Sequence, residues 1–421
     1  MPGRPEGRGP GRTAGNDGRE ESEAPRVTVW DDLVGQDRVV DRLRVAAKAA
    51  RDVLDGRDAT GMTHAWLFTG PPGSGRATAA RAFAAALQCV SPDLALGGEP
   101  GCGHCDGCHT ALTGTHADVD VVSTELLSIG VKETRDLVRR AAMSPAGGRW
   151  QVIVLEDADR LTEGAGNVLL KAIEEPAPRT VWMLCAPSVE DALPTIRSRC
   201  RHVSLRTPPV DAVADMLMRR DGIEPAMAAY AARATGGHID RALRLATDEQ
   251  ARTRRAEVLR MPLQVADIGG CMTAAQRLVD AAAADAKEIT AEMDARETEE
   301  LRSALGASGP GGRLPSGTAG VVKELENRQK KRATRMQRDC LDLALVDLTA
   351  FYRDVLAVQL GAGVHLDNED IRPSVEDIAR SGPPEATLRR IEAILACRQA
   401  IDANVAPLLA VEAMALTLRA G

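Results

Sequence analysis

Short apolar runs alternate with longer amphipathic stretches through the first half of the chain. A turn sequence follows each apolar run, and then a stretch rich in Ala, Leu and Arg with helical spacing. This alternation predicts a parallel sheet covered by helices, which is an α/β domain. The five runs with the length and content of strands cover residues 65–69, 119–122, 152–155, 181–185 and 202–205.

The strand pattern stops after Thr207-Pro208-Pro209, and the rest of the chain has helical spacing. Residues 210–246 predict three short helices, with one break at Gly236-Gly237. From about residue 250 the pattern predicts an all-helical domain, which a flexible Gly/Pro/Ser-rich loop at 306–320 interrupts. The expected domains are an α/β domain at 27–208, a small helical domain at 209–248 and a helical domain at 249–421.

The composition is consistent with several small cores. A chain of 421 residues exceeds what one hydrophobic core usually organises, which favours two or three domains. Aromatic residues are only 2% of the chain, so the cores must consist of Ala, Leu, Val and Ile, which suits closely packed helices. Residues 1–26 contain almost no apolar side chains, and we expect them to be a disordered tail.

Charge and hydropathy argue against several classes of protein. The net charge of −7 disfavours strong DNA binding by this chain alone, because phosphate contacts need a concentrated positive field. The sequence has no run of the roughly 18 apolar residues that span a membrane, and its N-terminus lacks the apolar segment of a secretion signal. We therefore expect a cytoplasmic protein without membrane contact.

A glycine-rich loop follows the first predicted strand and precedes a helix predicted at 78–88. Its sequence, GPPGSGRA at 70–77, has the position of a phosphate-binding loop, G-x-x-x-x-G-K-[ST]. In that motif the lysine reaches the β- and γ-phosphates and the hydroxyl binds Mg²⁺. Here Arg76 replaces the lysine and Ala77 replaces the hydroxyl, so we expect ATP binding to be weak or absent; a plain Gly/Pro turn is the alternative. The residues of this degenerate loop are Gly70, Gly73, Gly75 and Arg76.

An acidic pair, Glu156-Asp157, directly follows the third predicted strand. An apolar strand that ends in two acids is typical of a Walker B element, but the ATPase form has Asp before Glu. The pair therefore predicts a degenerate Walker B element, in which the shorter carboxylate stands where a base would activate water. Two solvated carboxylates at a strand end are the alternative.

Four of the nine cysteines lie close together in the sequence, with the spacing C-x12-C-x2-C-x2-C. Four thiolates that leave no open position for water favour a structural Zn²⁺ site. One alternative is that His104 or His109 replaces the first cysteine as a ligand. Disulfides are another alternative, which a reducing cytoplasm disfavours. The predicted zinc ligands are Cys89, Cys102, Cys105 and Cys108.

Three further motifs recur in a fixed order. Residues 30–36 read WDDLVGQ, residues 167–176 read NVLLKAIEEP, and residues 195–200 read TIRSRC. Together they resemble the AAA+ modules of bacterial clamp loaders, the family of gamma/tau and delta-prime subunits of DNA polymerase III, over roughly residues 27–245. The resemblance implies a zinc module inserted at 89–108, a helical lid domain and a helical collar domain.

The resemblance also implies a role for Arg199. In this family the arginine of the Ser-Arg-Cys motif contacts the γ-phosphate of ATP bound to the next subunit, which would make Arg199 an arginine finger that acts in trans. Two sensor positions depart from the ATPase pattern: Ala186-Pro187-Ser188 stands where motor subunits carry Thr or Asn, and Asp240 stands where they carry Arg, unless the helix uses Arg241. Such losses are typical of the delta-prime branch, whose members commonly lack ATPase activity.

The implied partners are gamma/tau and delta subunits in a hetero-pentamer, with the sliding clamp and primed DNA reached through the complex. The chain would then have no ATPase or polymerase activity of its own, although it would belong to the DNA polymerase III holoenzyme, a nucleotidyltransferase. The alternatives are an active gamma/tau-like ATPase that uses Arg76 and Glu156, and a zinc-organised adaptor outside replication. The basic run at 323–338 is a candidate DNA contact, with a solvated helix face as its alternative.

Overall fold

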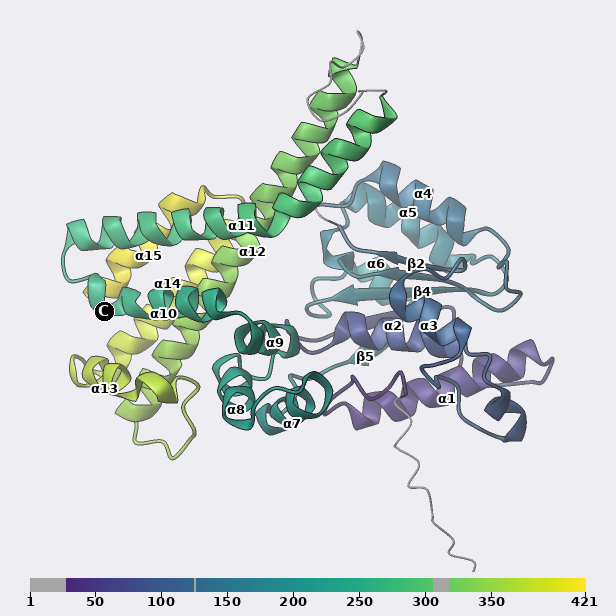
Figure 1. Cartoon of the computed structure of the whole chain (residues 1–421), viewed down its shortest axis with the longest axis horizontal. Helices are drawn as coiled ribbons and strands as arrows, with labels where there is room; N and C mark the ends of the chain where they lie inside the picture. Colours follow the sequence, from purple (N-terminus) through teal and green to yellow (C-terminus); the bar gives the residue numbers. More distant parts are fainter. Residues whose placement is uncertain (1–27, 125, 306–317) are drawn as a thin grey trace, which may run out of the picture.

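The computed structural model describes residues 28–124, 126–305 and 318–421. Along the chain it consists of an α/β domain, a small helical domain and a larger helical domain (Figure 1). The tail expected at 1–26 and most of the loop expected at 306–320 lie outside the described residues.

The α/β domain contains one sheet of five parallel strands in the order β2-β3-β4-β1-β5. The five strands predicted from the sequence are confirmed, each within one residue at either end. All residues of β1, β3 and β4 are buried, because helices cover both faces of the sheet, and these strands therefore read as continuous apolar runs. The strands are β1 (Ala65–Thr69), β2 (Val119–Val122), β3 (Gln151–Leu155), β4 (Thr180–Ala186) and β5 (Arg201–Ser204).

Successive residues of β4 point into two separate cores. Met183 packs in the core beneath α1, α2 and α3, whereas Trp182 packs in the core beneath α4 and α5. The predicted P-loop helix is α2, which begins two residues earlier than expected, directly after Gly75. The helices of this domain are α1 (Asp37–Leu54), α2 (Arg76–Leu87), α3 (Asp106–Thr113), α4 (Val131–Ala141), α5 (Glu163–Glu174) and α6 (Pro194–Arg197), with short 3₁₀ helices at Pro92–Leu96 and Ala158–Arg160.

Three short helices form the small helical domain, α7 (Val210–Asp221), α8 (Pro225–Ala234) and α9 (Ile239–Thr247). They share a core of their own that is rich in alanine. The predicted break at Gly236-Gly237 separates α8 from α9. Gly237 has a φ of 85°, and a Cβ atom there would lie 2.3 Å from the carbonyl oxygen of Pro208, so only glycine fits.

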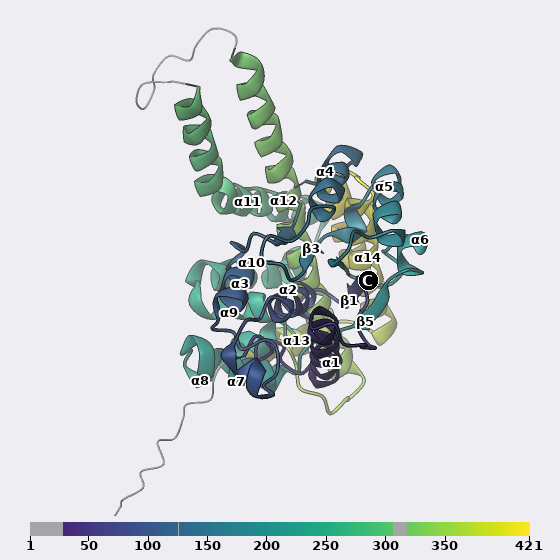
Figure 2. The same cartoon turned by 90° about the vertical axis from the view of Figure 1, so that its right-hand side faces the viewer.

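The C-terminal domain is a helical bundle from which one hairpin extends. The long helices α11 and α12 pack in the bundle near one end and project away from it near the other (Figures 1 and 2). None of the described helices combines the length and the apolar content needed to cross a membrane. The elements are α10 (Glu249–Gln264), α11 (Ile268–Ala304), α12 (Ala319–Gln359), a 3₁₀ helix at Glu369–Ile371, α13 (Arg372–Arg380), α14 (Pro384–Asp402) and α15 (Pro407–Ala420).

Three arginines of the basic run at 323–338 form ion pairs inside the molecule. The Arg332 side chain is only 3% exposed, and its guanidinium lies 2.5 Å from Asp294 Oδ1 and 2.8 Å from Glu297 Oε1 on α11. Arg328 also pairs with Glu297, at 2.5 Å. These pairs hold the projecting hairpin together, and they reduce the positive charge that the run could offer to DNA.

Candidate functional site

The opening motif, which ends at Gln36, ties together three parts of the α/β domain. The buried Trp30 donates from Nε1 to the carbonyl oxygen of Pro100, at 3.2 Å, in the loop that carries the cysteines. The Gln36 side-chain amide donates to the carbonyl oxygens of Ser74 in the glycine loop (3.3 Å) and Arg206 after β5 (2.5 Å). This segment therefore positions the glycine loop relative to the cysteine cluster.

The glycine loop connects β1 to α2, as a phosphate-binding loop does. Gly73 and Gly75 have φ values of 79° and 84°, the left-handed conformation that favours glycine. The guanidinium of Arg76 folds back and donates to the carbonyl oxygen of Gly70 in the same loop. In an active loop the corresponding lysine extends to the β- and γ-phosphates, whereas Arg76 is turned onto its own loop.

His238 of the small helical domain packs directly on the glycine loop. A Cβ atom on Gly73 would lie 2.3 Å from Cγ of the His238 ring. Burial lowers the pKa of His238, and the charges of Arg241 and Arg76 lower it further. The ring is therefore neutral at pH 7, and it covers the loop without adding positive charge for a phosphate.

Both carboxylates of the acidic pair are engaged. Glu156 Oε1 accepts a hydrogen bond from Arg81 Nε of α2 at 2.7 Å. Asp157 Oδ2 accepts from the backbone N–H of Thr124 at 2.8 Å, and its Oδ1 lies 3.3 Å from Arg335 Nη2 on α12. Asp157 therefore connects the α/β domain to the C-terminal domain.

The expected nucleotide-sensing positions make other contacts. After β4, Ser188 Oγ accepts from the backbone N–H of Asp191 at 3.3 Å, within its own turn. On α9, Asp240 is exposed, while Arg241 Nη2 lies 2.7 Å from Asp347 Oδ1 of α12. Arg241 therefore also links two domains.

We expect Arg335→Ala to lower the free energy of unfolding by about 1–3 kcal/mol, because Asp157 loses the nearer of its two ion-pair partners at a site where both side chains are less than one-fifth exposed. The midpoint of urea denaturation measures this loss. Lys331→Ala, at an exposed position one turn earlier on α12, is the matched control and should change stability by about 0.5 kcal/mol or less. If the two variants have the same midpoint of urea denaturation, the ion pair between Arg335 and Asp157 does not stabilise the fold.

Arg199 lies on the surface just after α6, with 39% of its side chain exposed. Its Nη2 lies 2.6 Å from Glu174 Oε1, and its Nη1 donates to the Thr195 carbonyl oxygen and the Ser198 hydroxyl, each at 3.0 Å. Glu174 belongs to the motif at 167–176. The fold thus brings together two of the segments that resemble the clamp-loader family, and one of them orients the arginine of the other.

The four clustered cysteines converge on one point. Their Sγ atoms all lie within 4.8 Å of one another, and Cys89 Sγ is 3.8 Å from Cys102 Sγ and 3.9 Å from Cys105 Sγ. Four sulfurs around zinc, each about 2.3 Å from the ion, lie about 3.8 Å apart. The cluster can therefore hold a tetrahedral metal ion.

The alternatives for the cysteines receive no support from the geometry. Within the described chain, the set of side chains that could hold a metal ion contains these four cysteines and no histidine. His104 is exposed, and its Nδ1 lies 2.9 Å from the carbonyl oxygen of Cys102. All nine cysteines are free thiols.

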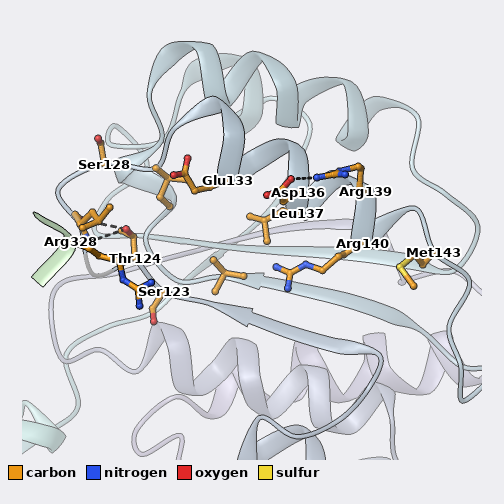
Figure 3. Close-up of a pocket in the computed structure, with 13 residues that line it drawn as sticks. Ser123, Thr124, Ser128, Glu133, Asp136, Leu137, Arg139, Arg140, Met143 and Arg328 are labelled. Carbon is orange, nitrogen blue, oxygen red and sulfur yellow. Dashed lines mark hydrogen bonds and ion pairs between the residues drawn. The ribbon is translucent and has the colours of Figure 1, made fainter. Parts of the chain in front are cut away.

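A cavity of about 820 Å³ lies at the β2 edge of the sheet, beside α4 (Figure 3). Its lining carries charges of both signs, and the guanidinium groups are already paired. Arg139 pairs with Asp136 on the same helix, and Arg140 Nη1 lies 3.2 Å from Asp120 Oδ1. These ion pairs engage the guanidinium groups of Arg139 and Arg140.

The order of the five strands, the loop between β1 and α2, the acids after β3 and the small helical domain that follows are those of an AAA+-type P-loop module. Residues 48–209 match the family described as "DNA polymerase III, delta subunit". The α/β domain is therefore similar to this family of clamp-loader subunits, as the motifs predicted.

Two relatives illustrate this similarity. The DNA polymerase III subunit delta' of Pseudomonas aeruginosa is 34% identical over 198 residues, which are 47% of this chain and 59% of that protein. The DNA polymerase III subunit gamma/tau of Mycobacterium tuberculosis is 33% identical over 195 residues, 46% of this chain and 31% of that protein. This chain thus matches less than two thirds of the length of either relative. A solved gamma subunit-related protein from Thermotoga maritima also matches this chain. The aligned region covers 89% of this chain and 99% of that protein, with 14% sequence identity and a TM-score of 0.38.

Several residues that shape the site carried no role in the sequence analysis. His238 lies two residues before Asp240, but nothing in the sequence places it against Gly73. Arg335 lies in the basic run, where it looks like any other solvated arginine. Arg81 is four residues beyond Ala77, and a charged residue that faces Glu156 from α2 could have suggested the ion pair.

Proposed function

We propose that this chain is the delta-prime subunit of a DNA polymerase III clamp loader, which does not hydrolyse ATP and supplies Arg199 to the ATPase site of a neighbouring subunit. One contrast carries the proposal. The groups that should bind and hydrolyse ATP, Arg76 and Asp157, are engaged inside the molecule, whereas Arg199 lies oriented at the surface.

The chemistry of an arginine finger suits Arg199. A guanidinium is permanently charged, and its planar donors match the phosphoryl oxygens that gain negative charge in the transition state. In the isolated chain Glu174 pairs with this guanidinium at 2.6 Å. In the assembly the γ-phosphate of the neighbour's ATP takes the place of Glu174 as its partner. Because the pair is exposed, the exchange costs little.

The proposed partners are gamma/tau and delta subunits in a hetero-pentamer that acts in the cytoplasm. The C-terminal domain serves as the collar that joins the subunits, and the small helical domain serves as the lid. The cysteine cluster binds a structural Zn²⁺, and the sliding clamp and primed DNA are reached through the complex. The net charge of −7 supports a division of labour in which partners bind DNA.

We expect the purified chain to show no ATP turnover with Mg²⁺, and we expect Arg76→Lys/Ala77→Thr to show none either. The double substitution restores the lysine and the hydroxyl, but Asp157 is still bound to Arg335 and His238 still covers Gly73. A phosphate-release assay measures both proteins. The gamma/tau subunit encoded by the same genome is the positive control. Turnover by the unmodified chain at the gamma/tau rate would instead identify an active ATPase.

Reconstitution with gamma/tau and delta tests the cellular role. The expected result is a stable complex that contains this chain and loads the sliding clamp onto primed DNA. Failure of this chain to join these subunits would favour an adaptor outside replication.

A further inference from the structure

The two amino groups of the Arg199 guanidinium are held by different helices. Nη1 donates to the carbonyl oxygen of Thr195 and to the hydroxyl of Ser198, each at 3.0 Å, at the end of α6. The Ser198 hydroxyl in turn donates to the same carbonyl oxygen, at 3.0 Å. Nη2 instead pairs with Glu174 Oε1 of α5, at 2.6 Å. One side of the guanidinium is thus bound to its own segment, and the other side to an exposed side chain of another helix.

Glu174 stands at a place where an acid by itself is unfavourable. It is the last residue of α5, and Glu175 follows it as the C-cap residue. The free carbonyl groups at a helix C-terminus carry partial negative charge, so acids there destabilise the helix. Lys171 is the basic residue of this last turn, and among the described residues it forms no ion pair with either acid. Arg199 therefore supplies the positive charge that Glu174 lacks on its own helix.

The pair between Arg199 and Glu174 is suited to exchange. Their side chains are 39% and 43% exposed, and an exposed ion pair changes an equilibrium by about two- to fivefold. A carboxylate carries one negative charge, whereas a terminal phosphate group carries nearly two at pH 7 and has three acceptor oxygens. A guanidinium matches the geometry of both. The pair therefore persists without a competing anion and yields to a terminal phosphate group.

We propose that Glu174 is the resting partner of Arg199. It holds the guanidinium on this chain while the neighbouring site is empty or contains ADP, and it releases the guanidinium to the γ-phosphate of ATP. The proposal rests on the function proposed above for Arg199. ADP lacks the terminal phosphate group that competes with the carboxylate, so the guanidinium returns to Glu174 after phosphate leaves. Glu174 thus acts through Arg199, as a positioning residue, and it sets the ATP concentration at which the neighbouring site engages the finger.

Glu174→Gln tests this role in the clamp loader reconstituted with the gamma/tau and delta subunits from the same genome. Glutamine keeps the shape of the side chain and removes the charge. We expect the ATP concentration that gives half of the maximal single-turnover rate at the neighbouring site to fall about two- to fivefold. The phase of hydrolysis that Arg199→Ala removes identifies this site. The effect should lie in this concentration and not in the rate at saturating ATP, because Arg199 then contacts the γ-phosphate in both complexes.

Two control complexes separate the pair from general charge. Glu175→Gln removes the adjacent acid, which pairs with no cation in the described part of the chain, and should leave the half-saturating ATP concentration unchanged. Glu174→Gln combined with Arg199→Ala should behave like Arg199→Ala alone, since Glu174 acts only through Arg199. The affinity of the complex for ADP, measured by competition, should be the same with and without Glu174→Gln.

The outcomes separate this inference from the proposed function. An unchanged half-saturating ATP concentration, an equal shift with Glu175→Gln, or a shift that persists without Arg199 overturns the resting-partner role. A rate at saturating ATP that falls more than about twofold, or failure of the Glu174→Gln complex to assemble, overturns it as well. In each of these cases the arginine finger still stands if Arg199→Ala impairs hydrolysis. If Arg199→Ala has no effect, both proposals fall.

Discussion

Arg199→Ala is expected to lower the rate of ATP hydrolysis at the neighbouring site of the reconstituted clamp loader by about 10³-fold or more. The loss follows from the removal of a permanent positive charge at the position where the transferred phosphoryl group gains negative charge. Single-turnover hydrolysis in the assembled complex measures it, because a steady-state rate would also include sites that this chain does not contact. The complex itself should still form, since the side chain is exposed in the isolated chain.

Arg197→Ala is the matched control for this experiment. Arg197 is also exposed, ends α6 and stands two positions before the proposed finger. If Arg199 acts through its position and not through its charge alone, Arg197→Ala should leave the rate of ATP hydrolysis within about twofold of that of the unmodified complex. Equal effects of the two substitutions, or no effect of Arg199→Ala, would remove Arg199 from the proposed mechanism.

Removal of the metal ion is expected to lower the stability of the chain strongly. The purified chain should contain one zinc ion, and Cys105→Ser should abolish it. Structural zinc sites contribute about 10 kcal/mol or more to folding in small zinc modules. Here, loss of the ion should unfold the loop at 89–108 and with it the contact of Trp30 with Pro100. Elemental analysis gives the zinc content, and calorimetry gives the fall in melting temperature.

Cys340→Ala is the control, because Cys340 is a free cysteine of α12 that lies outside the cluster. It should retain one zinc ion per chain. Zinc should also be released as the pH falls, since the thiolate ligands then become protonated. A chain that contains no zinc, or a Cys105→Ser variant that retains the ion and its melting temperature, would exclude a structural zinc site formed by these residues.

The parts of the fold that depend on local sequence could be predicted accurately. The buried strand at Ala65–Thr69 reads as a continuous apolar run because both of its neighbouring layers are apolar. Gly236-Gly237 predicts a turn, because glycine adopts positive φ without a steric penalty. Both residues do have positive φ in the structure. The spacing of the cysteines likewise predicts the cluster, since three of them lie within a short loop. In each case the residues that determine the feature are neighbours in the sequence.

Contacts between distant segments could not be predicted in this way. Arg335 is 178 residues away from Asp157, and a basic run gives no indication of which arginine will be paired. His238 meets Gly73 only because the small helical domain packs on the glycine loop.

The sequence by itself determined that this chain has a degenerate nucleotide loop, a four-cysteine cluster and the motifs of the clamp-loader family, because residue identity and spacing carry those features. Only the tertiary structure decided what the remaining groups do. It engages Asp157 with α12 and orients Arg199 on Glu174. The physical reason is that hydrogen bonds and ion pairs depend on distances of a few ångströms between side chains, which only the packing of the domains fixes.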